Sequence, residues 1–423
     1  MMKKVLKLVI LILLCTELNA IPPINIFRPS DRLLIPLIPL GSSFQLTVGY
    51  EGSFSTKVFQ DDFNDCNNIP GTGTPCIGSS ERCNVLQLYQ DQQNFLAGLK
   101  GFESTCPIGQ LSQLFNINDE NGLQGLFVPS GCFKVPLNLL ISARYYMKYN
   151  LSLALHMQVL SMELTDVKWR RTGINEDDNI DSNIINFVQD ISGLNIGGWK
   201  KTGFGDIVLQ GLWIQDFPQR KRLISNVQPQ FRLGINIPTG LKQDENRILA
   251  FPFGNDGSWG IQLGGGLSLD SWYGFRAGFD AEFLFLFGNT KTRRIKAECN
   301  QTDLLFLTKL PAFKEFGLGQ QFNVFFEKYI YGLGLGVDYQ YLKRDDDKLT
   351  IFNDGIDNVL SNTAQSLQDW TAHSIIASVR TFLPYYFPKL GACPTIFGWL
   401  KFGFNGKRAI LLNTVGINIT LSF

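Results

Sequence analysis

The sequence predicts an all-β fold, a transmembrane antiparallel β-barrel of about 12 strands with long extracellular loops. Three observations predict it. Hydrophobic residues make up 44% of the 423-residue chain, yet no run after residue 20 approaches the ~18 apolar residues that suggest a membrane helix. Polar and apolar residues alternate with period two along a series of stretches, as in strands with one apolar face. Long and short connections alternate between these stretches, as they do in outer-membrane barrels.

Composition and charge exclude two other classes of protein. The chain has 38 Lys and Arg against 37 Asp and Glu, so it lacks the basic excess that neutralises phosphates, and no nucleic-acid partner is expected. The hydrophobic content is also too high for an intrinsically disordered chain, which needs low hydrophobicity and high net charge.

Residues 1–20 have the layout of a secretory signal peptide. Lys3, Lys4 and Lys7 form a positive start, residues 8–14 are apolar, and the segment ends in the small residue Ala20. This apolar run is less than half of what a membrane-spanning helix needs. We expect a periplasmic N-terminal extension over 21–43, followed by an outer-membrane β-barrel over 44–423.

The alternation is clearest in the last strand. Apolar residues at positions 415, 417, 419, 421 and 423 share one face, while Asn418, Thr420 and Ser422 share the other. The strands predicted in this way are 44–58, 131–148, 150–166, 203–216, 224–238, 257–270, 272–288, 320–329, 330–343, 370–384, 394–405 and 409–423.

Ionisable residues gather on the polar faces of these strands, where a membrane barrel has its lumen. The candidates for lining the lumen and setting its selectivity are Glu51, Arg144, Arg232, Arg276, Asp280, Glu282, Glu327, Asp338 and Arg380. Both signs of charge occur, so we expect a charge-mixed lumen, and a pore that is narrow or gated by a loop rather than wide. The alternative is that salt-bridge ladders fill the lumen and nothing passes.

The connection over 59–130 is expected to be a large Cys-rich extracellular loop. The candidates for disulfide bonds, in or beside the outer loops, are Cys66, Cys76, Cys83, Cys106, Cys132 and Cys299. Disulfides form in the oxidising space outside the cytoplasm, and six cysteines allow fifteen pairings that the sequence does not rank. A metal site is the weaker alternative, because no C-x-x-C pair occurs.

The sequence contains few signatures of catalysis. The sequence has no H-E-x-x-H, G-x-S-x-G or P-loop motif. The pair His373-Ser374 is the sole candidate, and it lacks the oriented base and third group that an activated nucleophile needs. We therefore assign no catalytic residue, metal ligand or cofactor and expect no enzyme.

Two segments resemble known families. The ending Asn418-Ile419-Thr420-Leu421-Ser422-Phe423 resembles the C-terminal signal of Gram-negative outer-membrane proteins. The resemblance implies that barrel-assembly machinery recognises Phe423, Leu421 and Ile419; the alternative is that Phe423 is only the last lipid-facing residue.

The second resemblance joins two neighbouring strands. Gly203-Phe204-Gly205-Asp206-Ile207 and the later Phe231 to Gly240, which ends in Pro238-Thr239-Gly240, resemble the G-x-G-D and P-T-G motifs of outer-membrane transporters of aromatic-hydrocarbon pathways, distant relatives of long-chain fatty-acid channels. The likeness covers about 40 residues, and the Cys-rich first loop departs from the family pattern.

These observations predict an outer-membrane channel for passive uptake of small solutes, hydrophobic compounds among them. The alternative is a non-conducting surface barrel whose disulfide-stapled loops act in adhesion or partner binding. The expected partners are outer-membrane lipid, barrel-assembly machinery and a small-molecule solute; the expected location is the bacterial outer membrane, reached through the signal peptide.

Overall fold

The computed structural model describes residues 23–26, 28, 31, 43–60, 84–100, 126–171, 188–353, 355–383 and 393–423. The expected signal peptide, Cys66, Cys76, Cys83 and Cys106 lie outside these residues.

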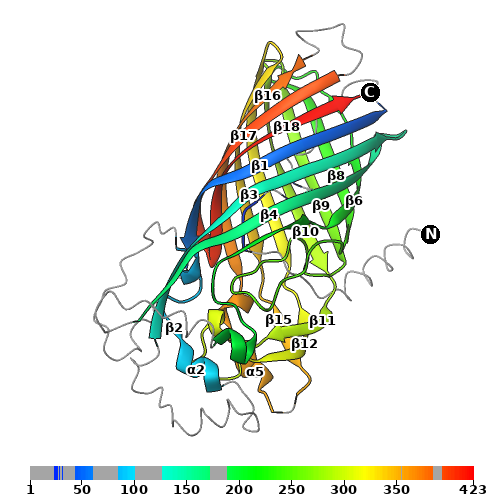
Figure 1. Ribbon diagram of the computed structural model, residues 1–423. Helices are drawn as coiled ribbons and strands as arrows, with labels where there is room; N and C mark the ends of the chain where they lie inside the picture. The colour runs from blue at the N-terminus through cyan, green and yellow to red at the C-terminus, as the bar shows by residue number, and fades with distance from the viewer. Residues whose placement is uncertain are drawn as a thin grey trace, which may run out of the picture.

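Within the described residues, twelve antiparallel strands form a closed barrel (Figure 1). They are β1 (Phe44–Phe59), β3 (Leu126–Tyr146), β4 (Leu151–Arg171), β6 (Ile207–Ile214), β8 (Ile224–Ile237), β9 (Gly260–Ser271), β10 (Phe275–Leu286), β13 (Gly319–Ile330), β14 (Leu333–Arg344), β16 (Trp370–Phe382), β17 (Cys393–Lys407) and β18 (Ala409–Ser422). The barrel closes because β1 pairs with β18 on one side and with β3 on the other. The expected fold class and strand number are confirmed.

The two ends of the barrel differ. Short turns join β3 to β4, β9 to β10 and β13 to β14 at the end that also holds the C-terminus. Long connections leave the other end, which by this pattern is the extracellular end. β3 and β4 run past the neighbouring strands there, and short β5 (Trp199–Phe204) and β2 (Gln93–Asn94) pair with their extensions. β7 (Phe217–Pro218) pairs with β8 at the periplasmic end.

A cap covers the extracellular end of the barrel (Figure 1). A small sheet of β11 (Asn289–Arg294), β12 (Lys309–Glu315) and β15 (Lys348–Ile351) forms part of it, with the helices α2 (Phe95–Lys100) and α5 (Asn358–Ser361). Single 3₁₀ turns occupy Val85–Gln87, Asp303–Leu305 and Gln365–Leu367. Two indoles anchor the cap, since Trp169 and Trp199 donate hydrogen bonds to the carbonyl oxygens of Ile196 and Ile248 at 3.0 and 2.8 Å.

The outer face of the barrel is apolar. On β8, Phe231, Leu233 and Ile235 are 65%, 57% and 46% exposed, whereas Arg232 between them is 2% exposed. Aromatic side chains are exposed near both ends of the wall, among them Trp272, Tyr273, Phe275, Phe54, Trp259 and Phe287. An apolar band flanked by aromatic residues is the surface that a barrel presents to lipid. No helix in the described parts of the chain is long and apolar enough to cross a membrane.

Part of the N-terminal segment lies inside the barrel. Within 21–43, where the sequence predicts a periplasmic extension, the described residues 23–26 lie against the inner wall. Ile24 pairs with Ile410, and Ile410 donates its backbone N–H to Pro23 at 2.7 Å. Ile24 and Ile26, 0% and 2% exposed, pack into the apolar core beneath the cap. Burial of these two side chains stabilises residues 23–26 at this position.

Candidate functional site

The nine predicted lumen residues all occupy inward-facing positions of their strands. Eight of them are at most 8% exposed, and Arg276 is half-buried. The parity of side chains along each strand places them there, because alternate residues point to opposite faces. The structure brings some of them together and leaves others apart.

The strongest contact joins β8 to β10. Arg232 donates two hydrogen bonds to Asp280, Nη1 to Oδ2 at 2.8 Å and Nη2 to Oδ1 at 2.7 Å. Its Nη2 also lies 3.2 Å from Oε2 of Glu282. This bidentate geometry fixes the two strands and gives the pairing directional specificity. Three of the nine predicted residues therefore form one compact ionic cluster.

Glu51 takes part in a ladder of hydrogen bonds with neutral side chains. Its carboxylate accepts hydrogen bonds from Asn138 Nδ2 at 2.9 Å and from Thr414 Oγ1 at 2.7 Å. Asn138 in turn accepts one from Gln158 at 3.2 Å. This ladder crosses β18, β1, β3 and β4 in the lumen, so polar contacts extend around the wall as well as along it.

The remaining candidates have separate environments. Arg276 pairs with Asp270 at 3.5 Å, a residue that the sequence reasoning did not select. Glu327 accepts a hydrogen bond from the Tyr329 hydroxyl at 2.8 Å. Arg380 lies over the Phe397 ring at 4.9 Å from its centroid, and Asp338 is buried on β14.

Arg144 differs from the others. It is 2% exposed, and Tyr146 on the same face of β3 is its side-chain hydrogen-bond partner. Two buried neighbours on the next strands, His156 and Gln210, form a side-chain hydrogen bond with each other.

Sequence reasoning missed Lys401 and the segment that it holds. Lys401 is 0% exposed on β17 and donates a hydrogen bond to the backbone oxygen of Asn25. Asn25 also bonds Ser374 Oγ at 2.9 Å, the oxygen of Leu412 at 3.2 Å and the N–H of Leu412 at 2.6 Å. The position of Lys401 between the outward-facing Leu400 and Phe402 is a signal that could have identified it as a lumen residue.

The two halves of the G-x-G-D and P-T-G motifs are in direct contact. Asp206 Oδ1 accepts the N–H of Gly240 at 2.8 Å, and Oδ2 accepts the N–H of Asn255 at 2.5 Å. Thr239 Oγ1 donates to the oxygen of Gly205 at 3.2 Å and accepts the N–H of Ile207 at 3.0 Å. The motif thus ties the extracellular 240–255 segment to the rim of the wall.

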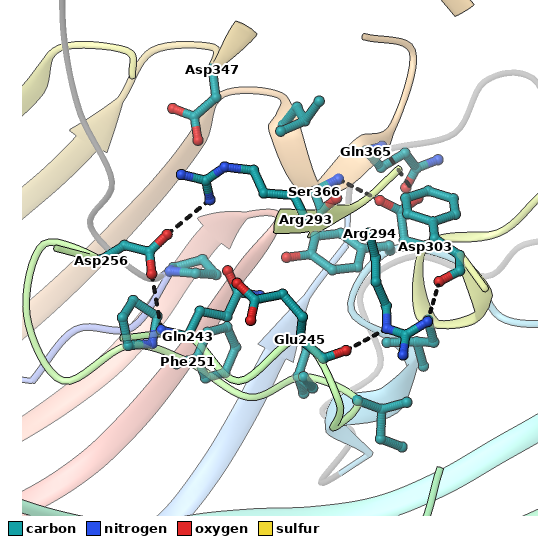
Figure 2. Close-up of a pocket in the computed structure, with 18 of the residues that line it drawn as sticks. Gln243, Glu245, Phe251, Asp256, Arg293, Arg294, Asp303, Asp347, Gln365 and Ser366 are labelled. Atoms are coloured by element: carbon teal, nitrogen blue, oxygen red, sulfur yellow. Dashed lines mark hydrogen bonds and ion pairs between the residues drawn. The ribbon is translucent and has the colours of Figure 1, made fainter. Parts of the chain in front are cut away.

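A cavity of about 190 Å³ lies between the cap and the barrel (Figure 2). Its lining carries both charges, with the side chains of Asp256 and Arg293 directed toward each other, and Arg294 on the opposite side. Arg294 Nη1 and Nη2 donate to the oxygens of Leu307 and Ser192 at 2.9 and 3.0 Å, and burial lowers its pKa to about 10. Arg294 therefore holds three cap segments in place beside the cavity.

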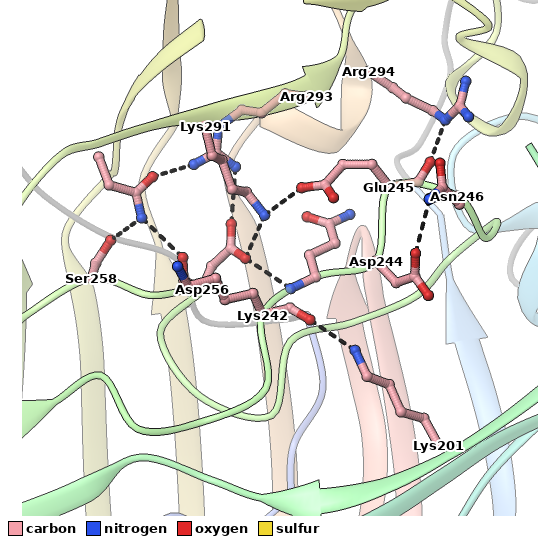
Figure 3. Close-up of polar contacts among 12 residues, drawn as sticks. Lys201, Lys242, Asp244, Glu245, Asn246, Asp256, Ser258, Lys291, Arg293 and Arg294 are labelled. Atoms are coloured by element: carbon pink, nitrogen blue, oxygen red, sulfur yellow. Dashed lines mark hydrogen bonds and ion pairs between the residues drawn. The ribbon is translucent and has the colours of Figure 1, made fainter. Parts of the chain in front are cut away.

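Asp256 is the centre of an ionic cluster on one wall of this cavity (Figure 3). Its carboxylate lies 2.7 Å from Lys291 Nζ and 2.9 Å from Arg293 Nη1, and it accepts the N–H of Gln243 at 2.9 Å. Burial alone raises the pKa of Asp256, but Lys291 and Arg293 outweigh it and hold the pKa below its usual value. Asp256 is therefore an anion at neutral pH.

A second ion pair lies at the cavity. Lys314 Nζ is 2.6 Å from Asp347 Oδ2, and Arg344 binds the same carboxylate. Burial lowers the pKa of Lys314 to about 8, with Asp347 opposing the shift. The run Asp345-Asp346-Asp347, a possible Ca²⁺ site from its charge alone, is instead engaged in protein contacts, because Lys343 pairs with Asp345 at 2.7 Å.

A smaller cavity of about 60 Å³ lies inside the barrel. Trp370 borders both cavities. Pro23 lines the first, while Ile24, Ile26 and Arg28 line the second. The N-terminal segment thus follows the route from the cap into the lumen.

The structure also places the pair His373-Ser374 and two of the cysteines. His373 contacts Tyr339 at 2.7 Å on the outer face, whereas Ser374 is 1% exposed and points into the lumen. The two side chains lie on opposite faces and form no catalytic pair. Cys132 lies within β3, and both it and Cys299 are free thiols in the described part of the chain. The other four disulfide candidates lie outside the described residues, so the disulfide bonds stay a prediction.

Comparisons with protein-family models and with curated proteins give no match. Among solved structures, an outer membrane channel from Pseudomonas putida F1 is 9% identical with a TM-score of 0.46, over 94% of this chain and 100% of that one. The β domain of the Bordetella autotransporter BrkA is 7% identical with a TM-score of 0.34, over 90% and 100%. The Pseudomonas putida toluene transporter TodX is 8% identical with a TM-score of 0.32, over 93% and 91%. A closed barrel with an apolar outer face and a polar interior makes this chain an outer-membrane β-barrel.

Proposed function

We propose that this barrel is a channel for passive uptake of small solutes, and that its N-terminal segment closes the lumen. One observation carries the proposal: one cavity lies at the cap and one inside the barrel, and the N-terminal segment lines both, the first with Pro23 and the second with Ile24, Ile26 and Arg28. If side chains filled the lumen only to stabilise the barrel, a separate chain segment between the cap and the lumen would not be needed. The charged and amide side chains of the wall suit a hydrated path once the segment moves.

Hydrophobic compounds belong among the candidate solutes. The lumen contains a buried apolar cluster of Leu140, Ile376, Phe397 and Trp399. Such a cluster can receive an apolar solute that has left water. The resemblance of the segments around Asp206 and Thr239 to hydrocarbon transporters points to the same class.

The contacts of Asn25 allow a direct test by conductance in planar bilayers. Asn25→Ala removes three side-chain hydrogen bonds that hold the segment, each worth about 1 kcal/mol. We expect a several-fold rise in conductance for this variant, and a larger rise when residues 23–31 are deleted. Asn300→Ala, the same change at an exposed cap position, serves as the control and should leave conductance as in the wild type.

The competing proposal is a non-conducting surface barrel whose loops bind a partner. It predicts that all of these proteins remain closed at every voltage. Heat-modifiable migration on unboiled SDS gels shows whether each variant is a folded barrel. Folded variants without conductance, the deletion included, would overturn the channel proposal.

A further inference from the structure

The outward face of the wall changes from apolar to basic at one level of β3, β4 and β5. Residues that are paired across the three strands form rows, and the last fully apolar row consists of Leu139, Val159 and Phe204. Two rows closer to the extracellular end, Glu163 on β4 is the direct partner of Lys134 on β3 and of Lys200 on β5. A carboxylate thus lies between two lysines at the same height of the wall.

This charged row lies at the surface of the hydrocarbon layer. Glu163 is four positions beyond Val159 on β4, which is about 13 Å along a strand and about 10 Å along the membrane normal for a strand tilted by ~40°. In the row between them, the hydroxyls of Ser161 and Thr202 bond each other at 2.8 Å, so the wall is already polar there. The two lysines therefore lie at the height of the lipid headgroups, where long basic side chains place their charge.

Positive charge dominates this outward face beyond the apolar rows. Its exposed basic residues, which we call the basic face, are Lys134, Lys168, Arg170 and Lys200. The acidic residues beside them are Glu163 and Asp166. Lys200 pairs with Glu163 at 3.2 Å, and its side chain remains 66% exposed. The other three basic residues make no ion pair with the described part of the chain, so the face keeps positive charge that the protein does not compensate.

Basic residues of other strands at this end of the barrel have partners within the protein. Lys343 on β14 pairs with Asp345 at 2.7 Å, and Lys407 on β17 pairs with Asp369 at 3.0 Å. The aromatic side chains of Trp259, Phe287 and Phe404 are exposed on the wall there instead. The contrast indicates that the basic face has a partner outside the chain.

The height and the chemistry of the basic face indicate the kind of partner. Lysine and arginine donate charge-assisted hydrogen bonds to phosphate oxygens, and each such residue near an anionic membrane surface adds to the attraction. A lipid that places its phosphate at the charged row also places its acyl chains on the apolar row below. An acidic protein in solution has no such apolar part, so the combination of the two rows favours a lipid.

We propose that the basic face binds the phosphorylated headgroup of a lipid in the outer leaflet of the membrane. Lys134 and Lys200 contact the phosphate next to the acyl chains, while Lys168 and Arg170 attract negative groups of the headgroup further from the membrane. The site lies on the outside of the wall and needs no conduction through the lumen, so it goes beyond the proposed channel.

Phosphatidic acid is the probe, and diacylglycerol with the same acyl chains is its counterpart without phosphate. Native mass spectrometry of the full-length protein in neutral detergent measures the binding of each lipid. We expect phosphatidic acid to bind about ten times more tightly than diacylglycerol. The double variant Lys134→Gln, Lys200→Gln should lose about tenfold in this binding. The control is Lys296→Gln, Lys348→Gln, which removes the same charge from two lysines of the cap and should bind as the wild type does.

Glu163→Gln separates lipid binding from a structural role of the ion pair with Lys200. This variant removes the carboxylate that competes with phosphate for Lys200, so we expect phosphatidic acid to bind about threefold more tightly. A purely structural ion pair would give unchanged or weaker binding, which would overturn the proposal. Heat-modifiable migration on unboiled SDS gels shows that each variant is a folded barrel.

Four other results would also overturn the lipid site. They are equal binding of phosphatidic acid and diacylglycerol, equal binding by the double variant and the wild type, an equal loss in the cap control, and displacement of the lipid by inorganic phosphate at the same concentration as the lipid. Displacement by soluble poly-glutamate at equal charge concentration would assign the basic face to an acidic macromolecule instead.

Discussion

Buried charges in this protein have different roles that depend on their partners. Arg232 and Arg144 are equally buried, at 2% exposure, and face the same lumen. Arg232 makes a bidentate contact with Asp280 and so contributes to the wall. Arg144 instead has the neutral Tyr146 as its side-chain hydrogen-bond partner. The same residue type at the same depth thus has charged partners in one place and a neutral partner in the other.

Lys314 predicts how the stability of the cap depends on pH. Its pKa is lowered to about 8 by burial, against about 10.4 in an unfolded chain. Between these values the unfolded state binds more protons, so the free energy of unfolding rises with pH in this window, by at most about 3 kcal/mol. Below about pH 8 this group contributes no slope. Thermal unfolding of the wild type and of Lys314→Met from pH 7 to 10.5 measures the difference.

The control for this prediction is the variant itself. Lys314→Met keeps Arg344 on Asp347 but lacks the titrating amine, so the wild type should gain stability relative to it between pH 8 and 10.5. A constant difference between the two proteins across this range would show that Lys314 has an ordinary pKa.

The residues of the lumen show what alternation alone can predict. All nine candidates face inward because one polar and one apolar face repeat along each strand. Their partners were harder to predict, since Asp280, Asp270 and Gln228 become neighbours of arginines only through the strand register. Lys401 and Asn25 were missed because their contact joins residues far apart in the chain, which no local pattern reports.

At the scale of elements, the sequence predicts strands well where one face meets lipid and poorly beyond it. The start of β3, at Leu126 to Ser130, contains Pro129, which argues against a strand, although it pairs with β4. β11 is the polar run Asn289–Arg294 and appears as part of a loop. Both lie outside the apolar band, where side chains do not contact lipid. Their residues need not alternate between apolar and polar, so the sequence pattern does not identify them as strands.

The contact of Asp206 with the 240–255 segment predicts a local effect of its removal. Asp206→Asn loses the charge from an acceptor of two backbone N–H groups at 2.8 and 2.5 Å, and bonds to a charged acceptor are worth about 2 kcal/mol each. We expect the segment to open more often, with faster amide exchange at Gly240 and Asn255, while the barrel stays heat-modifiable. Hydrogen exchange with mass spectrometry measures this change.

Asp216 provides the matched control for that experiment. It lies in a periplasmic turn and accepts hydrogen bonds from the side chains of Asn226 and Gln228 at 2.7 and 2.9 Å. Asp216→Asn should leave exchange in the 240–255 segment as in the wild type. If both variants increase it equally, Asp206 has no special role at the extracellular rim.

At the scale of the whole molecule, closure depends on the two ends of the chain. β1 and β18 pair along their length, and the last residue completes the joint. Phe423 donates its N–H to the oxygen of Phe44 at 2.9 Å, and its oxygen accepts the N–H of Ser43 at 2.7 Å. A barrel has no free sheet edge only when this joint forms, so assembly in the membrane must bring the C-terminal strand to the N-terminal one.

Substitution of Phe423 tests whether this residue is part of an assembly signal or is only the last lipid-facing residue. It is 55% exposed on the outer face, with its ring centroid 6.5 Å from that of Phe44. Phe404 on β17 is 47% exposed on the same face, so Phe423→Asp and Phe404→Asp each place a charge toward lipid. We expect Phe423→Asp to lower the heat-modifiable fraction in outer membranes several-fold more than Phe404→Asp, because assembly machinery reads the C-terminal strand. Equal losses would mean that Phe423 acts only through its contact with lipid.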